Sequence, residues 1–191
     1  MKTAYYPINP GDRYIYLLES SEFSSPATVY IDILSAREEG ELEKAEVRMI
    51  FRLQDYDTAE YEVSCGNGWV VSQNGIVTGG RKEFPLPPKK GCAWNESPDI
   101  CEITSMSEKV RVGAGDFEGC MKVETKISGG DGGRSARYYA PGTGLVLEEY
   151  YGEDATMRLT LTEKTGIPPI VPEAKKSKRT AAADKTKGTG I

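Results

Sequence analysis

The segment from Arg111 to Lys164 constrains the fold most, because apolar and polar residues alternate along several short stretches of it. Between residues 119 and 127, Met121, Val123 and Ile127 would point to one side, and the charged residues between them to the other. A period of two is typical of a half-buried β-strand. Glycine-rich and Pro-Gly turns separate four such stretches, which predicts a four-stranded meander. The expected strands are 119–127, 134–140, 145–151 and 155–162.

The same alternation recurs in the first half of the chain, most regularly between Ala45 and Leu53. The expected strands there are 13–19, 28–34, 45–53, 59–65, 69–72, 76–78 and 101–112. Asn74-Gly75 is a strong short hairpin signal and predicts that 69–72 pairs with 76–78. The proline-rich region 79–98 is expected to be the least regular part of the body. Its stretch 85–91 cannot be a central strand, so we expect it at the surface or at a sheet edge.

These patterns predict an all-β protein with a single domain of about 9–11 mostly antiparallel strands, which form a curved sheet, a half-barrel or a sandwich. The expected β domain covers residues 1–166 of the 191, which is long enough for a proper core. Residues 167–191 contain three prolines and then a basic stretch, and are expected to form a linker and a disordered C-terminal tail.

The charge is unevenly distributed along the chain. The whole chain carries −5, whereas residues 174–191 carry +5, which leaves −10 on the body. An acidic body argues against sequence-specific binding of nucleic acid. The basic tail is either a solubilising segment or a weak, salt-sensitive contact for polyanions.

The sequence also bears on location. It has no run of 18 apolar residues, so no transmembrane segment is expected. The stretch Met1–Pro7 lacks an apolar signal region. We therefore expect a cytoplasmic protein if Met1 is the native start, and a periplasmic or extracellular one if this is a mature form.

The absence of histidine excludes Ser-His-Asp and Cys-His catalysis. The remaining option is hydrolysis by a pair of carboxylates that converge across a cleft. The acids on expected strands (Asp32, Glu46, Glu60 and Glu62) alternate with apolar residues and should face solvent. We therefore expect a protein that is not an enzyme and has no cofactor.

Four cysteines occur, at positions 65, 92, 101 and 120, without a C-x-x-C spacing. With no histidine to complete a ligand set, no metal site is expected. A disulfide between Cys92 and Cys101 would close a short loop in an exported protein. Buried thiols are the alternative interpretation.

The most specific motif is Arg137–Val146, in which Pro141-Gly142 suits the two central positions of a type II turn. In one interpretation Tyr138 and Tyr139 lie at the mouth of a ligand cavity. In the other, which we favour, the turn fixes the register of the strands. One tyrosine is then in the core and its neighbour on the surface, because adjacent strand residues face opposite sides.

Three landmarks together resemble a group of uncharacterised bacterial β-rich envelope or secreted proteins. They are the aromatic-Pro-x-x-x-Gly stretch 6–11 before Tyr14-Ile15-Tyr16, the Gly-x-Phe turn and strand of 114–123, and Tyr-Tyr-Ala-Pro-Gly-x-Gly-Leu-Val at 138–146. The resemblance implies a curved antiparallel sheet, distantly like the lipoprotein-carrier folds, and a periplasmic or extracellular location. It implies no reaction and no catalytic residues.

Two non-enzymatic functions remain. The first is a binding or envelope-associated protein that holds a lipid, another small apolar ligand or a peptide on a concave sheet. The second is a structural or assembly subunit that binds a protein partner through sheet edges or the basic tail. A carboxylate-dependent hydrolase is a third and weaker hypothesis. The residues expected to line a cavity are Tyr14, Tyr16, Phe51, Trp69, Tyr138 and Tyr139.

Overall fold

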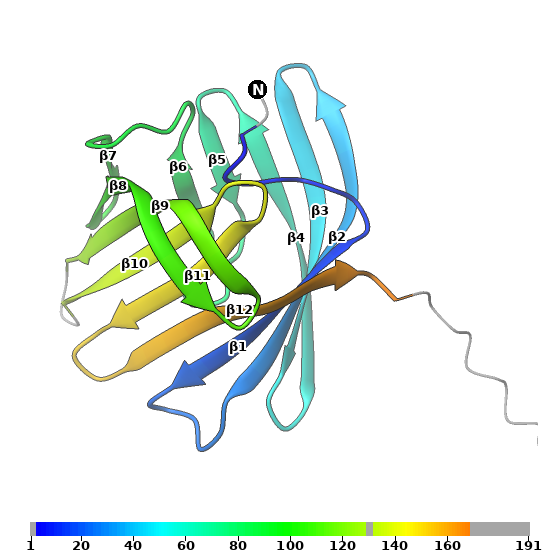
Figure 1. Ribbon diagram of the computed structural model, residues 1–191, viewed down its shortest axis with the longest axis vertical. Helices are drawn as coiled ribbons and strands as arrows, with labels where there is room; N and C mark the ends of the chain where they lie inside the picture. The colour runs from blue at the N-terminus through cyan, green and yellow to red at the C-terminus, as the bar shows by residue number, and fades with distance from the viewer. Residues whose placement is uncertain (1–2, 129–131, 169–191) are drawn as a thin grey trace, which may run out of the picture.

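A computed structural model describes residues 3–128 and 132–168 of the chain, and these residues form twelve β-strands and no helix (Figure 1). The strands are β1 (Asp12–Ser20), β2 (Ala27–Glu39), β3 (Leu42–Arg52), β4 (Tyr56–Gly66), β5 (Trp69–Ser72), β6 (Arg81–Pro85), β7 (Ala93–Glu96), β8 (Asp99–Val112), β9 (Gly115–Ile127), β10 (Gly133–Ala140), β11 (Gly144–Tyr151) and β12 (Thr156–Gly166). The expected basic tail lies outside the described residues.

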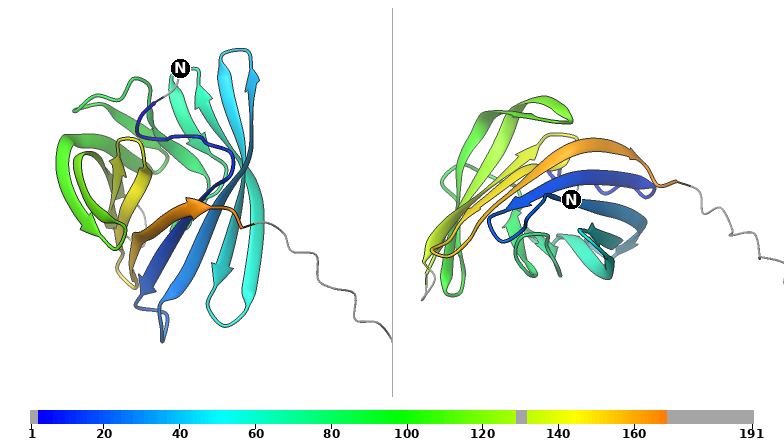
Figure 2. Two further views of the ribbon diagram at one scale, coloured as in Figure 1. Left: turned by 45° about the vertical axis from the view of Figure 1, so that its right-hand side comes forward. Right: turned by 90° about the horizontal axis from the view of Figure 1, so that it is seen from below.

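All twelve strands belong to one antiparallel sheet, in the order β6-β5-β4-β3-β2-β1-β12-β11-β10-β9-β8-β7. Each strand pairs with its neighbours along the chain, and β12 pairs with β1. The exception is the step from β6 to β7, which are the two edges of the sheet. The topology is therefore that of an up-and-down barrel opened at one seam, and the sheet curls round on itself (Figure 2). The expectation of an all-β half-barrel is confirmed, with twelve strands in place of nine to eleven.

The predicted meander corresponds to β9–β12, and its strand boundaries agree with the sequence pattern within a few residues. The pairing of β8 with β9 contains register shifts between Ile103 and Val110, and such bulges bend a strand. The bent hairpin reaches β12, where the Ala114 N–H donates to the Leu161 carbonyl at 3.0 Å. This contact ties the hairpin tip to the middle of the sheet.

The predicted Asn-Gly hairpin is wrong. Residues 76–78 form no strand, and β5 pairs instead with β6. The Ser72 hydroxyl bonds the Asn74 carbonyl, and the Asn74 side chain accepts a hydrogen bond from the Gly75 N–H. These local bonds fold residues 74–76 toward the concave face, so a longer loop replaces the tight turn. The proline-rich region contains both edge strands, in agreement with the expectation that prolines avoid central strands.

The core lies on the concave face, where alternate residues of every long strand meet. Tyr14, Tyr16 and Leu18 of β1 are buried there, beside Val29 of β2 and Leu161 of β12. Neighbouring residues on each strand point to the convex face, as their alternation predicts.

The position of Asp32 contradicts the expectation that the acids on the strands face solvent. It lies on the convex face, but it is fully buried beneath two arginines. Arg13 contributes two hydrogen bonds at 2.5 and 2.8 Å, and Arg48 donates at 2.7 Å. Since these residues are register neighbours on β1, β2 and β3, the strand pairing brings the three charges together. An acid that was expected to face solvent is therefore enclosed by its partners.

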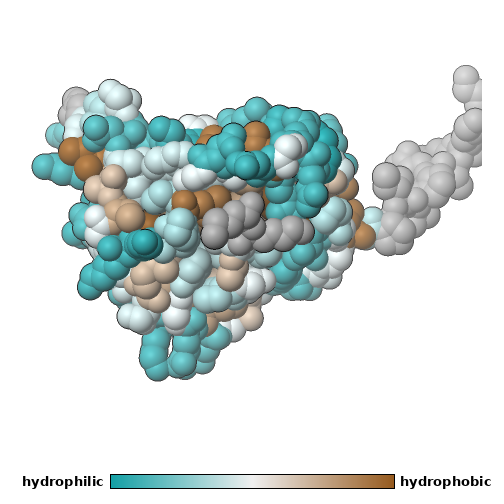
Figure 3. Space-filling view, turned by 90° about the horizontal axis from the view of Figure 1, so that it is seen from above, coloured by the Kyte–Doolittle hydropathy of each residue, from teal (hydrophilic) through white to brown (hydrophobic). Residues whose placement is uncertain are grey.

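The N-terminal segment 3–11 crosses one end of the half-barrel before it enters β1 (Figures 1 and 2). The Gly142 N–H donates to the Ala4 carbonyl at 2.7 Å, and the Tyr5 hydroxyl donates to the Gly119 carbonyl at 3.3 Å. Figure 3 looks down on the molecule from above and shows apolar surface between hydrophilic rims. The segment thus covers the concave face without joining the sheet.

Candidate functional site: a tyrosine-lined chamber and an ion-pair layer

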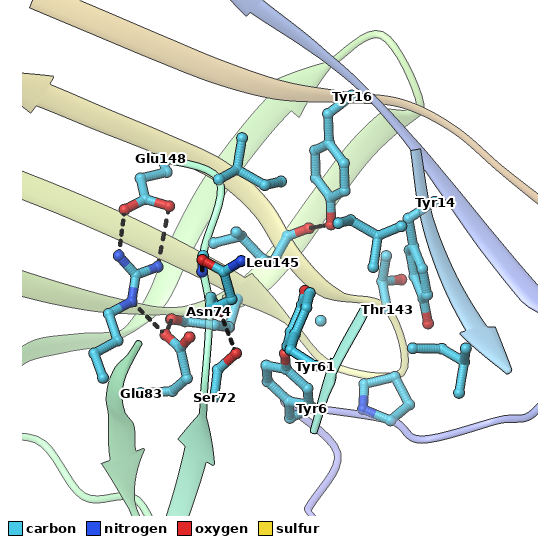
Figure 4. A pocket seen from close by; sticks show the side chains of 18 residues that line it. Tyr6, Tyr14, Tyr16, Tyr61, Ser72, Asn74, Glu83, Thr143, Leu145 and Glu148 are labelled. Atoms are coloured by element: carbon cyan, nitrogen blue, oxygen red, sulfur yellow. Dashed lines mark hydrogen bonds and ion pairs between the residues drawn. The ribbon is translucent and has the colours of Figure 1, made fainter. Parts of the chain in front are cut away.

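Beneath the N-terminal segment, the concave face forms a partly open chamber of about 70 Å³ (Figure 4). Its wall is mainly aromatic and apolar. The tyrosines that line it are Tyr6, Tyr14, Tyr16, Tyr61 and Tyr139, and the aliphatic residues are Ile31, Ile33, Ile76 and Leu145. Tyr6 and Pro7 come from the N-terminal segment, and residues 74–76 come from the loop after β5. The chamber is therefore closed partly by loops and partly by the sheet.

Burial keeps the tyrosines of the chamber neutral, and Tyr14, Tyr16 and Tyr139 also make hydrogen bonds. Burial raises the pKa of Tyr6 and Tyr16 well above the ordinary value, and burial also raises the pKa of Tyr139. The Tyr16 hydroxyl donates to the Leu145 carbonyl at 2.9 Å. The Tyr14 hydroxyl bonds Asp12 at 3.4 Å. The chamber thus presents aromatic surface with few hydroxyls left to bond a ligand.

One wall of the chamber is a cluster of four charged residues, Arg81, Glu83, Arg137 and Glu148, which we call the ion-pair layer. Arg81 binds Glu148 through two hydrogen bonds at 2.8 and 3.1 Å, and its Nε donates to Glu83 at 3.0 Å. Arg137 Nη1 and the Tyr139 hydroxyl both donate to Glu83, at 2.7 and 2.6 Å. Strand β6 supplies two members, and β10 and β11 supply one each.

The electrostatics of the layer keep Glu83 ionised. Burial by itself would raise the pKa of Glu83, but the charges of Arg81 and Arg137 outweigh it, so the pKa lies below the ordinary value. A glycosidase acid needs a raised pKa instead. Glu83 is therefore a poor general acid, and the layer acts as a balanced set of two cations and two anions.

Three of the six residues expected to line a cavity lie together. Tyr14, Tyr16 and Tyr139 all border the chamber. Tyr14 and Tyr16 come from β1, and Tyr139 comes from β10 on the far side of β12 and β11. The curvature of the sheet therefore brings them to one place.

The other three lie elsewhere. Phe51 packs edge-on against Phe23, with ring centroids 6.1 Å apart. Trp69 packs edge-on against Trp94 at 5.9 Å, near the seam between the sheet edges. Tyr138 is on the convex face, where the Lys122 ammonium lies 5.5 Å from its ring centroid. The adjacent tyrosines thus divide between core and surface, as β alternation requires.

The sequence analysis missed Tyr6, Tyr61 and all four members of the ion-pair layer. The sequence did contain one signal for Arg137. It lies two residues before the buried Tyr139 on the same strand, so both side chains face the interior. A charged residue at an inward position indicates a buried partner. Its partner Glu83 comes from the region expected to be irregular, so the pairing itself was not predictable.

Cys92 and Cys101 are not joined by a disulfide in the structure. Cys101 pairs with Trp94 across β7 and β8, and Cys92 precedes that partner by two residues. The two cysteines are therefore diagonal neighbours, with Cα atoms roughly 7–8 Å apart, whereas a disulfide needs about 4.4–6.8 Å.

The described ranges 3–128 and 132–168 hold no cluster of three metal-ligating acids or cysteines. Within these ranges there is also no helix long and apolar enough to cross a membrane.

No protein-family model matches the sequence, and no curated protein matches it in sequence. Two solved structures are similar in fold. One is a protein described as exported, with a YmcC-like fold, from Bacteroides fragilis, with a TM-score of 0.66 and 14% identity over 86% of this chain and 100% of that one. The other is described as a lipoprotein from Parabacteroides distasonis, with a TM-score of 0.60 and 14% identity over 85% and 99% of the two chains.

The chain shares the fold of these two proteins. At 14% identity the likeness extends to the fold alone. LprF from Mycobacterium bovis covers 84% of this chain with a TM-score of 0.34, which is too low to indicate a common fold.

Proposed function

We propose that this protein is a non-enzymatic, envelope-associated binding protein that holds a small apolar or amphipathic molecule in the tyrosine-lined chamber. The observation that carries this proposal is the way in which the chamber is closed. Its cover is the N-terminal segment 3–11 and not another strand of the sheet. A cover outside the hydrogen-bonded ladder can move without breaking the sheet.

The size of the chamber requires such a movement. A volume of about 70 Å³ has room for about two water molecules, at roughly 30 Å³ each. Small-molecule sites typically have volumes of about 300–1,000 Å³. Tyr6 and Pro7 project into the space from the segment, so displacing them would enlarge it. We therefore propose that a ligand replaces Tyr6 against Tyr16, Tyr61 and Tyr139.

The envelope location rests on two supports. The Bacteroides protein of the same fold is described as exported and the Parabacteroides protein as a lipoprotein. The sequence landmarks independently resemble bacterial envelope or secreted proteins. Together they favour a periplasmic or extracellular protein over a cytoplasmic one.

The test compares native with denaturing mass spectrometry of protein purified without denaturant. We expect an extra mass in the native spectrum that is lost on denaturation and is identified as a lipid or small metabolite. Tyr6→Ala should enlarge the chamber and increase the uptake of an apolar fluorescent probe such as 1-N-phenylnaphthylamine. The matched control is Tyr138→Ala, which removes a tyrosine from the convex face. A bare wild-type mass, together with equal probe uptake by the two variants, would refute the proposal.

The assembly hypothesis has one observation in its favour. Among the described residues, β6 and β7 each pair with a strand on one side only. Trp94, near this seam, is buried, and its Nε1–H has no acceptor among the residues that the structure describes. An edge of this kind can accept a strand from a partner. Light scattering that shows a monomer over a wide concentration range would argue against self-assembly through this edge.

A further inference from the structure

A second cavity lies on the other side of the ion-pair layer, and we call it the vestibule. Its volume is about 450 Å³. Its polar lining consists of Thr78, Arg81, Glu96, Ser97, Asp99, Thr125, Ser135, Arg137 and Tyr150, with Cys101 and Ile127 beside them. Unlike the chamber, it is large enough for a small molecule without any movement of the chain.

The strand register places the vestibule and the chamber on opposite sides of the layer. On β10, Ser135 of the vestibule precedes Arg137 by two residues, and Tyr139 of the chamber follows it by two. On β11, which runs the other way, Tyr150 follows Glu148 on the vestibule side. The layer therefore separates an aromatic compartment from a polar one.

Arg137 lines the vestibule and has donors that no described residue accepts. It is only 1% exposed, and its Nη1 is occupied by Glu83 and Tyr139. Its Nε–H has no acceptor among the described residues, and the one contact recorded for Nη2 is the Cys101 sulfur at 3.8 Å. The Nε–H and an Nη2–H lie along one edge of the guanidinium and point the same way. That edge is the one that binds a carboxylate with two parallel hydrogen bonds.

We propose that the vestibule binds a small monocarboxylate through the Nε and Nη2 edge of Arg137. A buried charged donor without an acceptor is costly, so the site favours a group that supplies two oxygens. The hydroxyls of Thr125, Ser135 and Tyr150 line the same cavity and can bond the rest of the ligand. The site is independent of the chamber and does not require the proposed function to be correct.

The surrounding acids disfavour a second negative charge on the ligand. Within the layer, two arginines already balance two glutamates. Glu96 and Asp99 add two carboxylates to the lining of the vestibule, where they accept hydrogen bonds from the Lys82 and Ser128 N–H groups. These acids would repel a dianion about twice as strongly as a monoanion at equal distance. A monocarboxylate is therefore favoured over a phosphate monoester.

The test uses the side-chain Nε–H resonance of Arg137 in ¹H–¹⁵N NMR spectra of the full chain. The probes are acetate, L-lactate and benzoate, with acetamide, lactamide and benzamide as matched neutral molecules, and inorganic phosphate as the dianion. We expect a saturable downfield shift with at least one monocarboxylate at millimolar concentration, and no shift with its amide or with phosphate. Equal shifts with an acid and its amide, or a stronger response to phosphate, would overturn the assignment. No shift with any carboxylate would overturn the site.

Variants provide a second readout. Arg137→Lys keeps the positive charge but loses the two-donor edge, so it should weaken carboxylate binding by at least tenfold. Arg134→Lys is the matched control, because Arg134 lies on the same strand but stacks on Tyr151 outside the interior. Ser135→Ala tests the vestibule without touching an ion pair, in case Arg137→Lys fails to fold. It should weaken L-lactate binding severalfold, and unchanged binding of every carboxylate in Ser135→Ala and in folded Arg137→Lys would refute the site.

Discussion

Replacing Arg81 with methionine tests the ion-pair layer most directly. Arg81 makes every hydrogen bond recorded for Glu148, which is fully buried, and it shares Glu83 with Arg137. In Arg81→Met, Glu83 therefore keeps its ion pair with Arg137, whereas Glu148 loses its ion pair and keeps only the longer-range charge of Arg137. Removing one partner of a buried pair typically costs about 3–5 kcal/mol, because a buried charge is left without compensation. We expect this loss in the free energy of unfolding.

Urea denaturation followed by tryptophan fluorescence and circular dichroism measures the loss. For a domain of this size it corresponds to a fall in Tm of between about 6 and 20 °C. The matched control is Arg13→Met, the same change on the convex face, where Asp32 retains Arg48. The control should cost less, about 1.5 kcal/mol, at the low end for hydrogen bonds to a charged group, because the buried Asp32 keeps two hydrogen bonds from Arg48. Adding Glu148→Gln to Arg81→Met should restore at least about 1 kcal/mol, since the two residues are directly coupled.

The pH dependence gives an independent check. Burial by itself would raise the pKa of Glu83, and the charge of Arg81 is the largest of the effects that hold it below the ordinary value. A lowered carboxyl pKa stabilises the folded state above the unfolded pKa of about 4.3, and this contribution is lost as the pH falls through the folded pKa. The deficit of Arg81→Met should therefore be full near neutral pH and shrink as the pH falls below about 4.3. A loss no larger than that of Arg13→Met, or one that is independent of pH, would refute a buried, ionised layer.

Three further predictions follow from individual residues. Gly142 has a φ of +74° with open space at its Cβ position, so Gly142→Ala should lower the free energy of unfolding in urea by about 1–2 kcal/mol. The control is Gly79→Ala, which should not destabilise the protein, because Gly79 also has open space at its Cβ position but no positive φ. Burial would raise the pKa of Asp32, but hydrogen bonds from its two arginines lower it below the ordinary value. Asp32→Asn should therefore be less stable than the wild type above about pH 4, and the difference in free energy of unfolding should shrink as the pH falls through the folded pKa. Cys92 is half-buried, whereas Cys120 is buried and burial raises the pKa of its thiol to about 11. Iodoacetamide should therefore label Cys92 first and Cys120 only on unfolding, which mass mapping of the labelled peptides would show.

The sequence by itself determined the strands and their faces. Alternation is a local property, because successive strand side chains must point to opposite sides whatever the strand pairs with. The meander from β9 to β12 and the shared face of Tyr14 and Tyr16 were therefore readable from the residues, whereas the choice between Tyr138 and Tyr139 for the core was not. The proline-rich region was expected at the surface or at a sheet edge, because proline cannot donate to a ladder, and both edge strands lie in it.

Only the tertiary structure decided which inward and outward residues meet. Asp32 was expected in solvent, but the register of three strands encloses it between two arginines. The Asn74-Gly75 signal was overridden because residues 74–76 fold toward the chamber and bond within the loop.

The ion-pair layer and the chamber depend on curvature in the same way. Arg81 and Glu148 are 67 residues apart and lie on strands separated by six others in the sheet order. The sheet must curl almost into a barrel before β6 faces β10 and β11 across the interior. No local pattern records that closure, because its driving force is the burial of the whole concave face.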